Sequence, residues 1–392
     1  MSRRPLELAA EVMEKLASIY GVSELIEVAH VHISGVSYLT IGDAGLEFLE
    51  DLASKGTKFR VSATVNPIGF DLEHVEQLKI PQDFVNKQLR ILNALKSMGA
   101  NLILSCTPYE IIDLPPGTHV AWGESNAVIY ANSILGLRTN REGGPLTVLA
   151  AILGKVPKYG LHLDEVRKPT HLVEVKYSQP LNHLVASALG YIIGELVVTG
   201  VPLIRGNIIK YFSESPHGHE LVKLFLASLA TSSQVNRCII PNLSRDYGGE
   251  VPSKVIEVEE KDIRKAIDEL SSGATPDAIA IGCPHCSLKE VMLTYKILER
   301  EGIRARKLFL LFTSRRVKEE LRRLGVLSKL SERGVLVCAD TCIVVSPIVR
   351  TLGIKVVMTN SGKAAHYLRR MHGIDVVLGD LYDCIKEVRN GA

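Results

Sequence analysis

Three cysteines are the side chains of this 392-residue sequence with the clearest capacity for chemistry. Cys283 follows a predicted buried strand at 278–281 and precedes a predicted helix at 288–301. Short loops after parallel strands are where α/β proteins place their chemistry. Cys106 and Cys342 stand in comparable settings, at or just beyond an apolar run and beside Pro or Thr. Thiolates are soft ligands suited to zinc or iron–sulfur clusters, so three of them on separate strand ends suggest one shared iron–sulfur cluster.

The residues alone leave other interpretations of these cysteines open. Buried thiols are common, so all three could be core residues. Cys283 and Cys286 form a C-x-x-C pair before a helix, which would suit redox chemistry, but no second pair accompanies it as in a zinc site. His285 between them could be a ligand or a hydrogen-bonding loop residue. The other three cysteines fall in apolar stretches and are expected to be core thiols: Cys238, Cys338 and Cys384.

Several expected loops carry groups that could hold an anion. Strand 355–358 leads into 359–363 (Thr-Asn-Ser-Gly-Lys), where amides at a helix start and the charge of Lys363 suit phosphate or carboxylate, although a plain capped turn is the alternative. Residues 34–37 (Ser-Gly-Val-Ser) and 66–67 (Asn-Pro) offer further amides and hydroxyls, which turn chemistry also explains. Residues 124–126 (Glu-Ser-Asn) place a carboxylate, a hydroxyl and an amide before a helix, where the hydroxyl or amide could instead be an N-cap.

The composition excludes several classes of protein. A net charge of +3 is too small to argue for nucleic acid or an acidic membrane surface, and 5% aromatic residues argue against base-stacking platforms. No signal peptide is expected at the start of the chain. The most apolar stretch, 184–204, carries Glu195, Pro202 and three glycines, which favours a buried helix over a membrane span. We expect a cytoplasmic protein without structural disulfides.

Strands and helices alternate along most of the chain, which predicts an α/β fold with parallel sheets flanked by helices. Early strands are expected at 29–34, 59–64 and 102–105. From a strand at 254–258 to the end, the alternation is regular and flavodoxin-like. The expected domains are an N-terminal α/β domain, a middle α/β domain and a C-terminal flavodoxin-like domain: 1–135, 136–250 and 251–392.

Six short motifs together resemble the aconitase X family, over nearly the whole chain. They are SGVSYLTIGD at 34–43, WGESNA at 122–127, YANS at 130–133, RTNREGG at 138–144, GCPH at 282–285 and DTC at 340–342. The resemblance implies an aconitase-like multi-domain fold with a 4Fe-4S cluster on Cys106, Cys283 and Cys342. A 2Fe-2S cluster or a single iron on the same thiols is the alternative. It also implies a set of substrate contacts: Gly35, Val36, Ser37, Asn66, Pro67, Glu124, Ser125 and Lys363.

The implied activity is that of a hydro-lyase. Iron would act as a Lewis acid in the dehydration of (R)-5-phosphomevalonate to trans-anhydromevalonate 5-phosphate, in an archaeal mevalonate route to isoprenoids. Cys286 departs from the pattern as an extra thiol beside Cys283. No sequence is found for the swivelling domain that carries the family's proton-abstracting serine. We therefore expect no catalytic base in this chain, and a small swivel-domain subunit as its partner in a heterodimer. The alternatives are dehydration of another hydroxy acid, such as a hydroxyproline, and a non-catalytic iron-binding scaffold.

Overall fold

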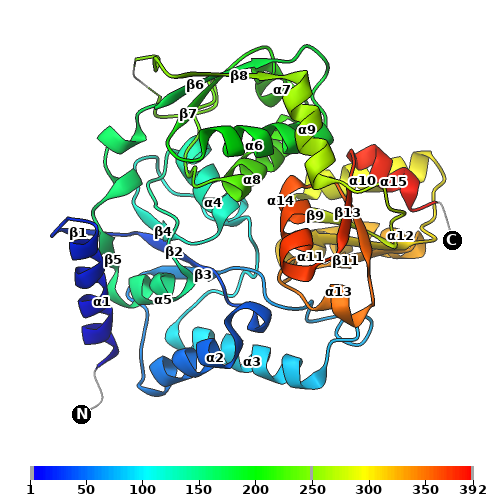
Figure 1. Ribbon diagram of the computed structural model, residues 1–392. Helices are drawn as coiled ribbons and strands as arrows, with labels where there is room; N and C mark the ends of the chain where they lie inside the picture. The colour runs from blue at the N-terminus through cyan, green and yellow to red at the C-terminus, as the bar shows by residue number, and fades with distance from the viewer. Residues whose placement is uncertain (1–3, 248–249, 390–392) are drawn as a thin grey trace.

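Parallel sheets organise three α/β parts of the chain around a common centre (Figure 1). The computed structural model describes residues 4–247 and 250–389. The outermost residues of the first and last expected domains, 1–3 and 390–392, therefore lie outside the described residues. The expected fold class, mixed α/β with helix-flanked parallel sheets, is confirmed. Among the described residues, no helix combines the length and apolar character needed to cross a membrane.

The first part is built on the three-stranded parallel sheet β3-β2-β4. A two-stranded antiparallel ribbon, β1 with β5, lies beside it (Figure 1). The strand expected at 29–34 is seen as β2, and the one expected at 59–64 begins three residues later, as β3. The strand expected at 102–105 is wrong, because a positive φ of 47° at Leu104 interrupts the extended backbone. The elements are β1 (Leu25–Glu27), β2 (His30–Ile33), β3 (Ser62–Val65), β4 (Val120–Trp122), β5 (Lys155–Pro157), α1 (Pro5–Ile19), α2 (Tyr38–Ser54), α3 (Gln82–Met98), α4 (Ser125–Tyr130) and α5 (Gly144–Leu153).

The second part packs two apolar helices against the parallel sheet β7-β6-β8. The helix α6 is the buried helix expected within 184–204, and it lies directly against α8 because a Cβ at Gly190 would collide with the carbonyl oxygen of Phe225. Strand β8 pairs with β6, which places it in this sheet and not in the C-terminal one where the sequence put it. The expected domain limits at 135 and 250 stay a prediction. The elements are β6 (His171–Lys176), β7 (Pro202–Arg205), β8 (Val255–Glu259), α6 (His183–Val197), α7 (Ile209–Ser213), α8 (Gly218–Ser232) and α9 (Glu260–Leu270).

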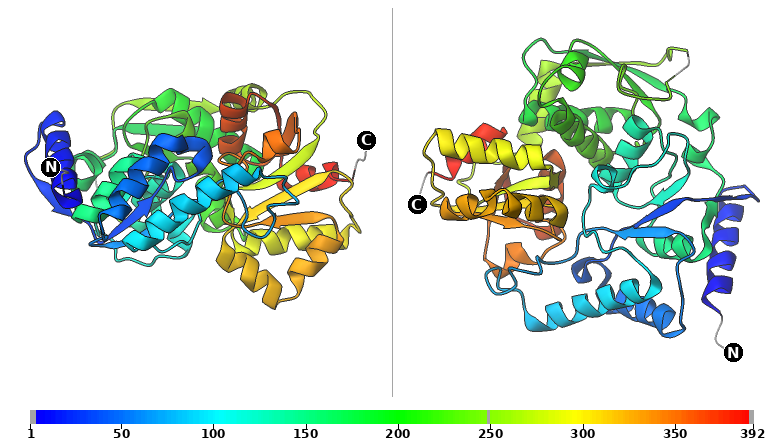
Figure 2. Two further views of the ribbon diagram at one scale, coloured as in Figure 1. Left: turned by 90° about the horizontal axis from the view of Figure 1, so that it is seen from below. Right: turned by 180° about the vertical axis from the view of Figure 1, so that it is seen from behind.

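The third part is a doubly wound sheet of five parallel strands in the order β11-β10-β9-β12-β13. Numbered along the chain this order is 3-2-1-4-5, so the likeness to flavodoxin, whose order is 2-1-3-4-5, is one of architecture. Helices cover both faces (Figure 2). The elements are β9 (Ala278–Cys286), β10 (Leu308–Thr313), β11 (Val335–Cys338), β12 (Val356–Thr359), β13 (Asp375–Leu378), α10 (Leu288–Arg300), α11 (Arg315–Arg323), α12 (Val326–Glu332), α13 (Ile348–Thr351), α14 (Gly362–Tyr367) and α15 (Leu381–Glu387).

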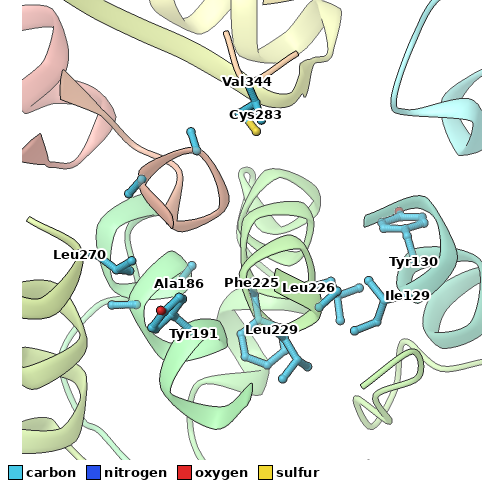
Figure 3. Packing of buried hydrophobic residues seen from close by; sticks show 14 of the residues in the cluster. Ile129, Tyr130, Ala186, Tyr191, Phe225, Leu226, Leu229, Leu270, Cys283 and Val344 are labelled. Carbon is cyan, nitrogen blue, oxygen red and sulfur yellow. The ribbon is translucent and has the colours of Figure 1, made fainter. Parts of the chain in front are cut away.

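Side chains of β9 alternate between two hydrophobic cores, as the two faces of a strand require. Ile279 and Ile281 pack under α10, α12 and α15, whereas Ala278 and Ala280 face the large central core that α6 and α8 share. Figure 3 shows α8 in the middle of this central core, between α6 and α4. The residues that the figure labels there are Phe225, Leu226 and Leu229 on α8, Ala186 and Tyr191 on α6, and Ile129 and Tyr130 on α4.

Short irregular helical turns link the main elements. Three are 3₁₀ turns: Pro108–Glu110, Gly160–His162 and Glu165–Arg167. Two are π-helical: Ala131–Leu135, which continues α4, and Leu368–His372, which continues α14. These last two extend the helices whose first turns lie at the site described below, and π-helical turns are frequent near functional sites.

Candidate active site

The eleven residues that the sequence singled out lie on the wall of one cavity of ≈ 300 Å³. They come from two of the three parts of the chain: the first supplies eight of them, and the third supplies Cys283, Cys342 and Lys363 at its edge. The full set is Gly35, Val36, Ser37, Asn66, Pro67, Cys106, Glu124, Ser125, Cys283, Cys342 and Lys363. The structure thus brings together residues more than 300 positions apart, and what they bind stays a prediction.

The cavity lies at the point of the third sheet where the strand order reverses. The chain leaves β9 toward β10 on one side and later returns to β12 on the other, and a crevice forms outside the carboxyl ends of these two strands. Cys283 is near the end of β9, and Lys363 follows the end of β12. The doubly wound topology therefore delivers a thiol and an ammonium group to the same crevice.

Cys283 projects from an irregular stretch of β9. Ile281 pairs with Leu311 and Cys286 with Thr313, so four residues of β9 stand opposite the single residue Phe312. Gly282 has a φ of 106°, and a Cβ there would collide with the carbonyl oxygen of Phe312, so this position requires glycine. The following Cys283–Pro284 peptide bond is cis.

Cys286 does not share the cavity with Cys283. It returns to the regular register of β9 and packs in the core beneath α10, next to Ile281 and Val291. Cys238, Cys338 and Cys384 are also buried in the hydrophobic cores, which confirms the expectation that they are core thiols, although the Cys338 sulfur also lies near Asp71 and His74. No disulfide forms among the seven cysteines.

His285 connects the three segments that carry the cavity cysteines. Its Nε2 donates to the carbonyl oxygen of Thr341 (2.8 Å), so its Nδ1 is left to accept from the Ser105 hydroxyl (3.1 Å). Its backbone N–H donates to Sγ of Cys106 (3.3 Å). Burial lowers the pKa of His285 to about 4, so the ring is neutral. Of the two roles that the sequence allowed, the structure therefore shows the hydrogen-bonding one, with both ring nitrogens occupied.

Burial keeps the cavity thiols protonated. It raises the pKa of Cys283 to about 12, and it also raises the pKa values of Cys106 and Cys342. Such thiols ionise when a metal supplies the positive charge that stabilises the thiolate. Three sulfur donors from three rigid segments, aimed into one buried cavity, fit a soft metal centre.

Glu124 and Lys363 form a buried ion pair at the wall of the cavity. Burial opposes charge on both, yet each compensates the other, so the pKa of Glu124 lies below and that of Lys363 above its ordinary value. Lys363 also donates to Oδ1 of Asn126 (2.7 Å) and to Oγ of Ser125 (3.3 Å). Its three N–H donors are therefore all used within the chain.

Helix capping was an alternative role for the polar residues at the starts of α14 and α4, and the structure shows it only at α14. Ser361 caps α14 by accepting from the N–H of Ala364, so the plain capped turn exists there, and Lys363 projects from it into the cavity. Neither Ser125 nor Asn126 caps α4; Asn126 instead donates to the carbonyl oxygen of Cys106 (2.8 Å).

A chain of hydrogen bonds, all donated in the same direction, leads from Trp122 to Glu124. The Trp122 indole N–H donates to Nδ1 of His30 (3.0 Å), whose Nε2–H then donates to Thr64 (3.4 Å). Thr64 in turn donates to Nδ1 of His32 (2.8 Å). Burial lowers the pKa of His30 to about 3 and that of His32 to about 4, so both rings are neutral, as this sequence of donors requires.

This series of hydrogen bonds continues to the cavity. His32 donates from Nε2 to Oδ1 of Asn66 (3.3 Å), and Asn66 donates from Nδ2 to Oε2 of Glu124 (2.8 Å). The direction of donation thus fixes which end of the Asn66 amide faces Glu124. The Glu124 carboxylate is held at both oxygens, by Asn66 on one and Lys363 on the other.

Arg141 is a cavity residue that the sequence did not single out. This residue lines the cavity from the segment before α5, within the RTNREGG motif, but was assigned no role. An arginine in a glycine-rich break was the available signal. Tyr367 and Met371 also line the cavity, at its third-part side, and nothing in their sequence setting distinguished them.

One further group has the composition of a metal site but not its chemistry. Asp71, His74 and Cys338 have ligand atoms within 4.8 Å of one another. However, Asp71 Oδ2 already accepts from Nζ of Lys318 (2.8 Å) and from the N–H of Ala339 (2.6 Å). A lysine cation therefore occupies the position that a metal would need.

A cysteine-lined crevice between the first and third of three α/β parts defines a class, and comparison with known proteins supplies its family. Models of the aconitase X first, second and third domains match residues 2–165, 169–268 and 276–390. The chain therefore belongs to the aconitase X family.

Individual relatives agree with this assignment. The phosphomevalonate dehydratase large subunit of Methanocaldococcus jannaschii is 40% identical, over 97% of this chain and 95% of the relative. The crystal structure of Thermococcus kodakaraensis aconitase X in its holo-form superposes with a TM-score of 0.88 at 36% identity, over 98% of this chain and 95% of that one. A cis-3-hydroxy-L-proline dehydratase of Pseudomonas aeruginosa is 31% identical, over 98% of this chain and 67% of the relative.

Proposed function

We propose that this chain is the cluster-binding large subunit of a hydro-lyase that dehydrates (R)-5-phosphomevalonate to trans-anhydromevalonate 5-phosphate. The observation that carries the proposal is the joint placement of three cysteines and the Glu124–Lys363 pair in one cavity. It is supported by identities of 37–40% to five large subunits named for that activity. The more distant hydroxyproline dehydratases make a hydroxyproline the competing substrate.

Cys106, Cys283 and Cys342 would hold the cluster, because they are the thiols that line the cavity and thiolates are the usual ligands of 4Fe-4S clusters. With three protein ligands, such a cluster would have an open iron and would supply Lewis-acid chemistry toward a hydroxyl group.

The residues of this chain would bind and orient the substrate. Glu124, held at both oxygens, presents a fixed carboxylate edge to the cavity, and Ser37, Ser125 and Asn66 add hydroxyl and amide groups around it. Glu124 is a weak base here, because Lys363 holds the pKa of the carboxyl below its usual range. This supports the expectation that the base which removes the substrate proton, a serine, comes from a small swivel-domain partner.

A partner subunit would complete the cavity. The relatives at 37–40% identity are each named as a large subunit, which supports a heterodimer. On the cavity wall, Thr40 and Met371 are exposed, Met371 at 51% of its surface, so a covering subunit has accessible residues to contact.

Turnover by the purified complex tests the proposal. The chain, with and without a co-expressed small subunit, is assayed anaerobically with (R)-5-phosphomevalonate and with cis-3-hydroxy-L-proline. We expect dehydration of (R)-5-phosphomevalonate only by the complex. Full activity of this chain alone would contradict the partner. If the complex dehydrates only the hydroxyproline, that compound is the substrate. Iron binding without turnover of either compound would favour a scaffold.

A further inference from the structure

Arg141 is the cation on the cavity wall that lacks an acidic partner in the described part of the chain. Its Nε donates to Oδ1 of Asn236 (2.9 Å) and its Nη2 to the carbonyl oxygen of Ala230 (3.0 Å), and both acceptors are neutral. No ion pair joins it to a described carboxylate, and Glu124 is already held by Lys363 and Asn66. Removing a charge from water without compensation is costly, so this guanidinium has a strong preference for an anion.

Two hydrogen bonds orient the guanidinium and leave part of its donor capacity for a ligand. The bonds to Asn236 and Ala230 fix its plane, and they leave Nη1 without a partner among the residues that the structure describes. A guanidinium offers five N–H groups in a fork that matches two oxygens of a phosphate or carboxylate. Lys363 differs, because Glu124, Ser125 and Asn126 occupy its three donors.

Arg141 and Lys363 are held by different segments of the cavity wall. Asn126, which accepts from Lys363, donates to the carbonyl oxygen of Cys106, and Ser361, two residues before Lys363, donates to the carbonyl oxygen of Cys283. Arg141 is bonded instead to Ala230 and Asn236, which belong to a segment without a cavity cysteine. An anion on Arg141 would therefore be the end of a ligand that is remote from the reacting hydroxyl.

We propose that Arg141 binds the phosphate group of the substrate and is the residue that selects a phosphorylated hydroxy acid. The inference rests on the proposed function and deepens it. It assigns the phosphate to an uncompensated guanidinium held by Asn236 and Ala230, and it leaves to the Glu124–Lys363 pair the part of the ligand nearer the thiols.

Binding to the co-expressed complex tests this assignment without depending on turnover. Calorimetry would measure the affinities of (R)-5-phosphomevalonate, (R)-mevalonate and inorganic phosphate for wild type, Arg141→Gln and Arg141→Lys. A charge-assisted contact of this kind predicts about a 10- to 100-fold weaker affinity of Arg141→Gln for (R)-5-phosphomevalonate. The affinity for (R)-mevalonate should change by less than about twofold, and Arg141→Lys should be intermediate because it keeps the charge without the fork.

The matched control is Arg138→Gln, which removes an arginine paired with Asp164 outside the cavity and should leave all affinities unchanged. Iron content and melting temperature show whether each variant is folded, and if Arg141→Gln does not fold, Arg141→Lys carries the comparison. An unchanged phosphate preference in a folded Arg141 variant would overturn the inference, as would an equal loss of both organic ligands. The two proposals can fail separately. If the wild-type complex binds (R)-5-phosphomevalonate through Arg141 but does not dehydrate it, the proposed function is refuted and the Arg141 assignment is still supported.

Discussion

The Nε2 atom of His285 lies 2.8 Å from the carbonyl oxygen of Thr341, the residue directly before Cys342. The same imidazole bonds to Ser105, directly before Cys106, and stands two residues after Cys283. One neutral side chain thus sets the relative positions of three cysteine-bearing segments. Because both nitrogens are occupied, His285 acts through the backbone and not as a ligand.

Replacing His285 with alanine should therefore release the cysteine segments. His285→Ala leaves a void and at least one buried polar group without its partner, so the free energy of unfolding should fall by about 2–4 kcal/mol. Iron per folded protein should fall as well. His119→Ala removes an imidazole paired with His162 away from the cavity and is the control, which should retain full iron. Undiminished iron in His285→Ala would show that the segments hold their positions unaided.

The two neighbouring thiols, Cys283 and Cys286, should respond in opposite ways to serine. Cys283→Ser should lose most of the bound iron, because it removes a sulfur from the cavity. Cys286→Ser should keep the iron and lower the free energy of unfolding by about 1–3 kcal/mol, since it places a hydroxyl in the apolar core beneath α10. Iron analysis and chemical denaturation measure both effects. The reverse pattern would make Cys286 the ligand.

The buried pair of Glu124 and Lys363 should show strong coupling in a double-mutant cycle. Either Glu124→Gln or Lys363→Met leaves one buried charge unpaired, which should cost about 3–5 kcal/mol of stability. The double variant should recover part of that loss without recovering activity. Denaturation of the four proteins gives the coupling energy, and additive losses would contradict a charged, directly interacting pair.

Glu142 should make stability fall as pH rises. Burial raises the pKa of this carboxyl to about 7, and one of its oxygens has no hydrogen-bond partner among the described residues. Between the ordinary value near 4.5 and pH 7, the unfolded chain loses the proton while the folded one keeps it. Over this window the native state should therefore lose up to about 3 kcal/mol.

The stability difference between wild type and Glu142→Gln isolates this effect. As the pH rises from 4.5 to 7, wild type should lose stability relative to the variant, because glutamine does not ionise. Denaturation midpoints at several pH values measure it, and a difference that stays constant across the window would place the pKa of Glu142 near its usual value.

The sequence predicted the alternation of strands and helices well where the pattern was regular. Residues 278–378 form the expected parallel, helix-flanked sheet because their strands are short, apolar and separated by amphipathic helices. The pattern could not show that β8 pairs with β6, since one strand looks alike in either sheet. Nor could it reveal the positive φ at Leu104, because leucine rarely adopts the left-handed backbone conformation.

Part of the site was also within reach of the sequence. Motifs located the three cysteines and eight proposed contacts, but only the fold shows that all eleven line one cavity. The spacing of Cys283 and Cys286 gave no means of choosing between them, because the choice depends on an irregularity of β9. Arg141 was passed over because its significance is the absence of a carboxylate partner, which is a three-dimensional property.

The central claim is that the cavity holds both an iron–sulfur cluster and the substrate. Anaerobic iron and sulfide analysis with EPR, on this chain co-expressed with its small subunit, tests it most directly when spectra are recorded before and after addition of (R)-5-phosphomevalonate. We predict about four irons and four sulfides per complex, and a spectrum that changes with the substrate. Absence of iron, or a cluster whose spectrum ignores the substrate, would contradict the account.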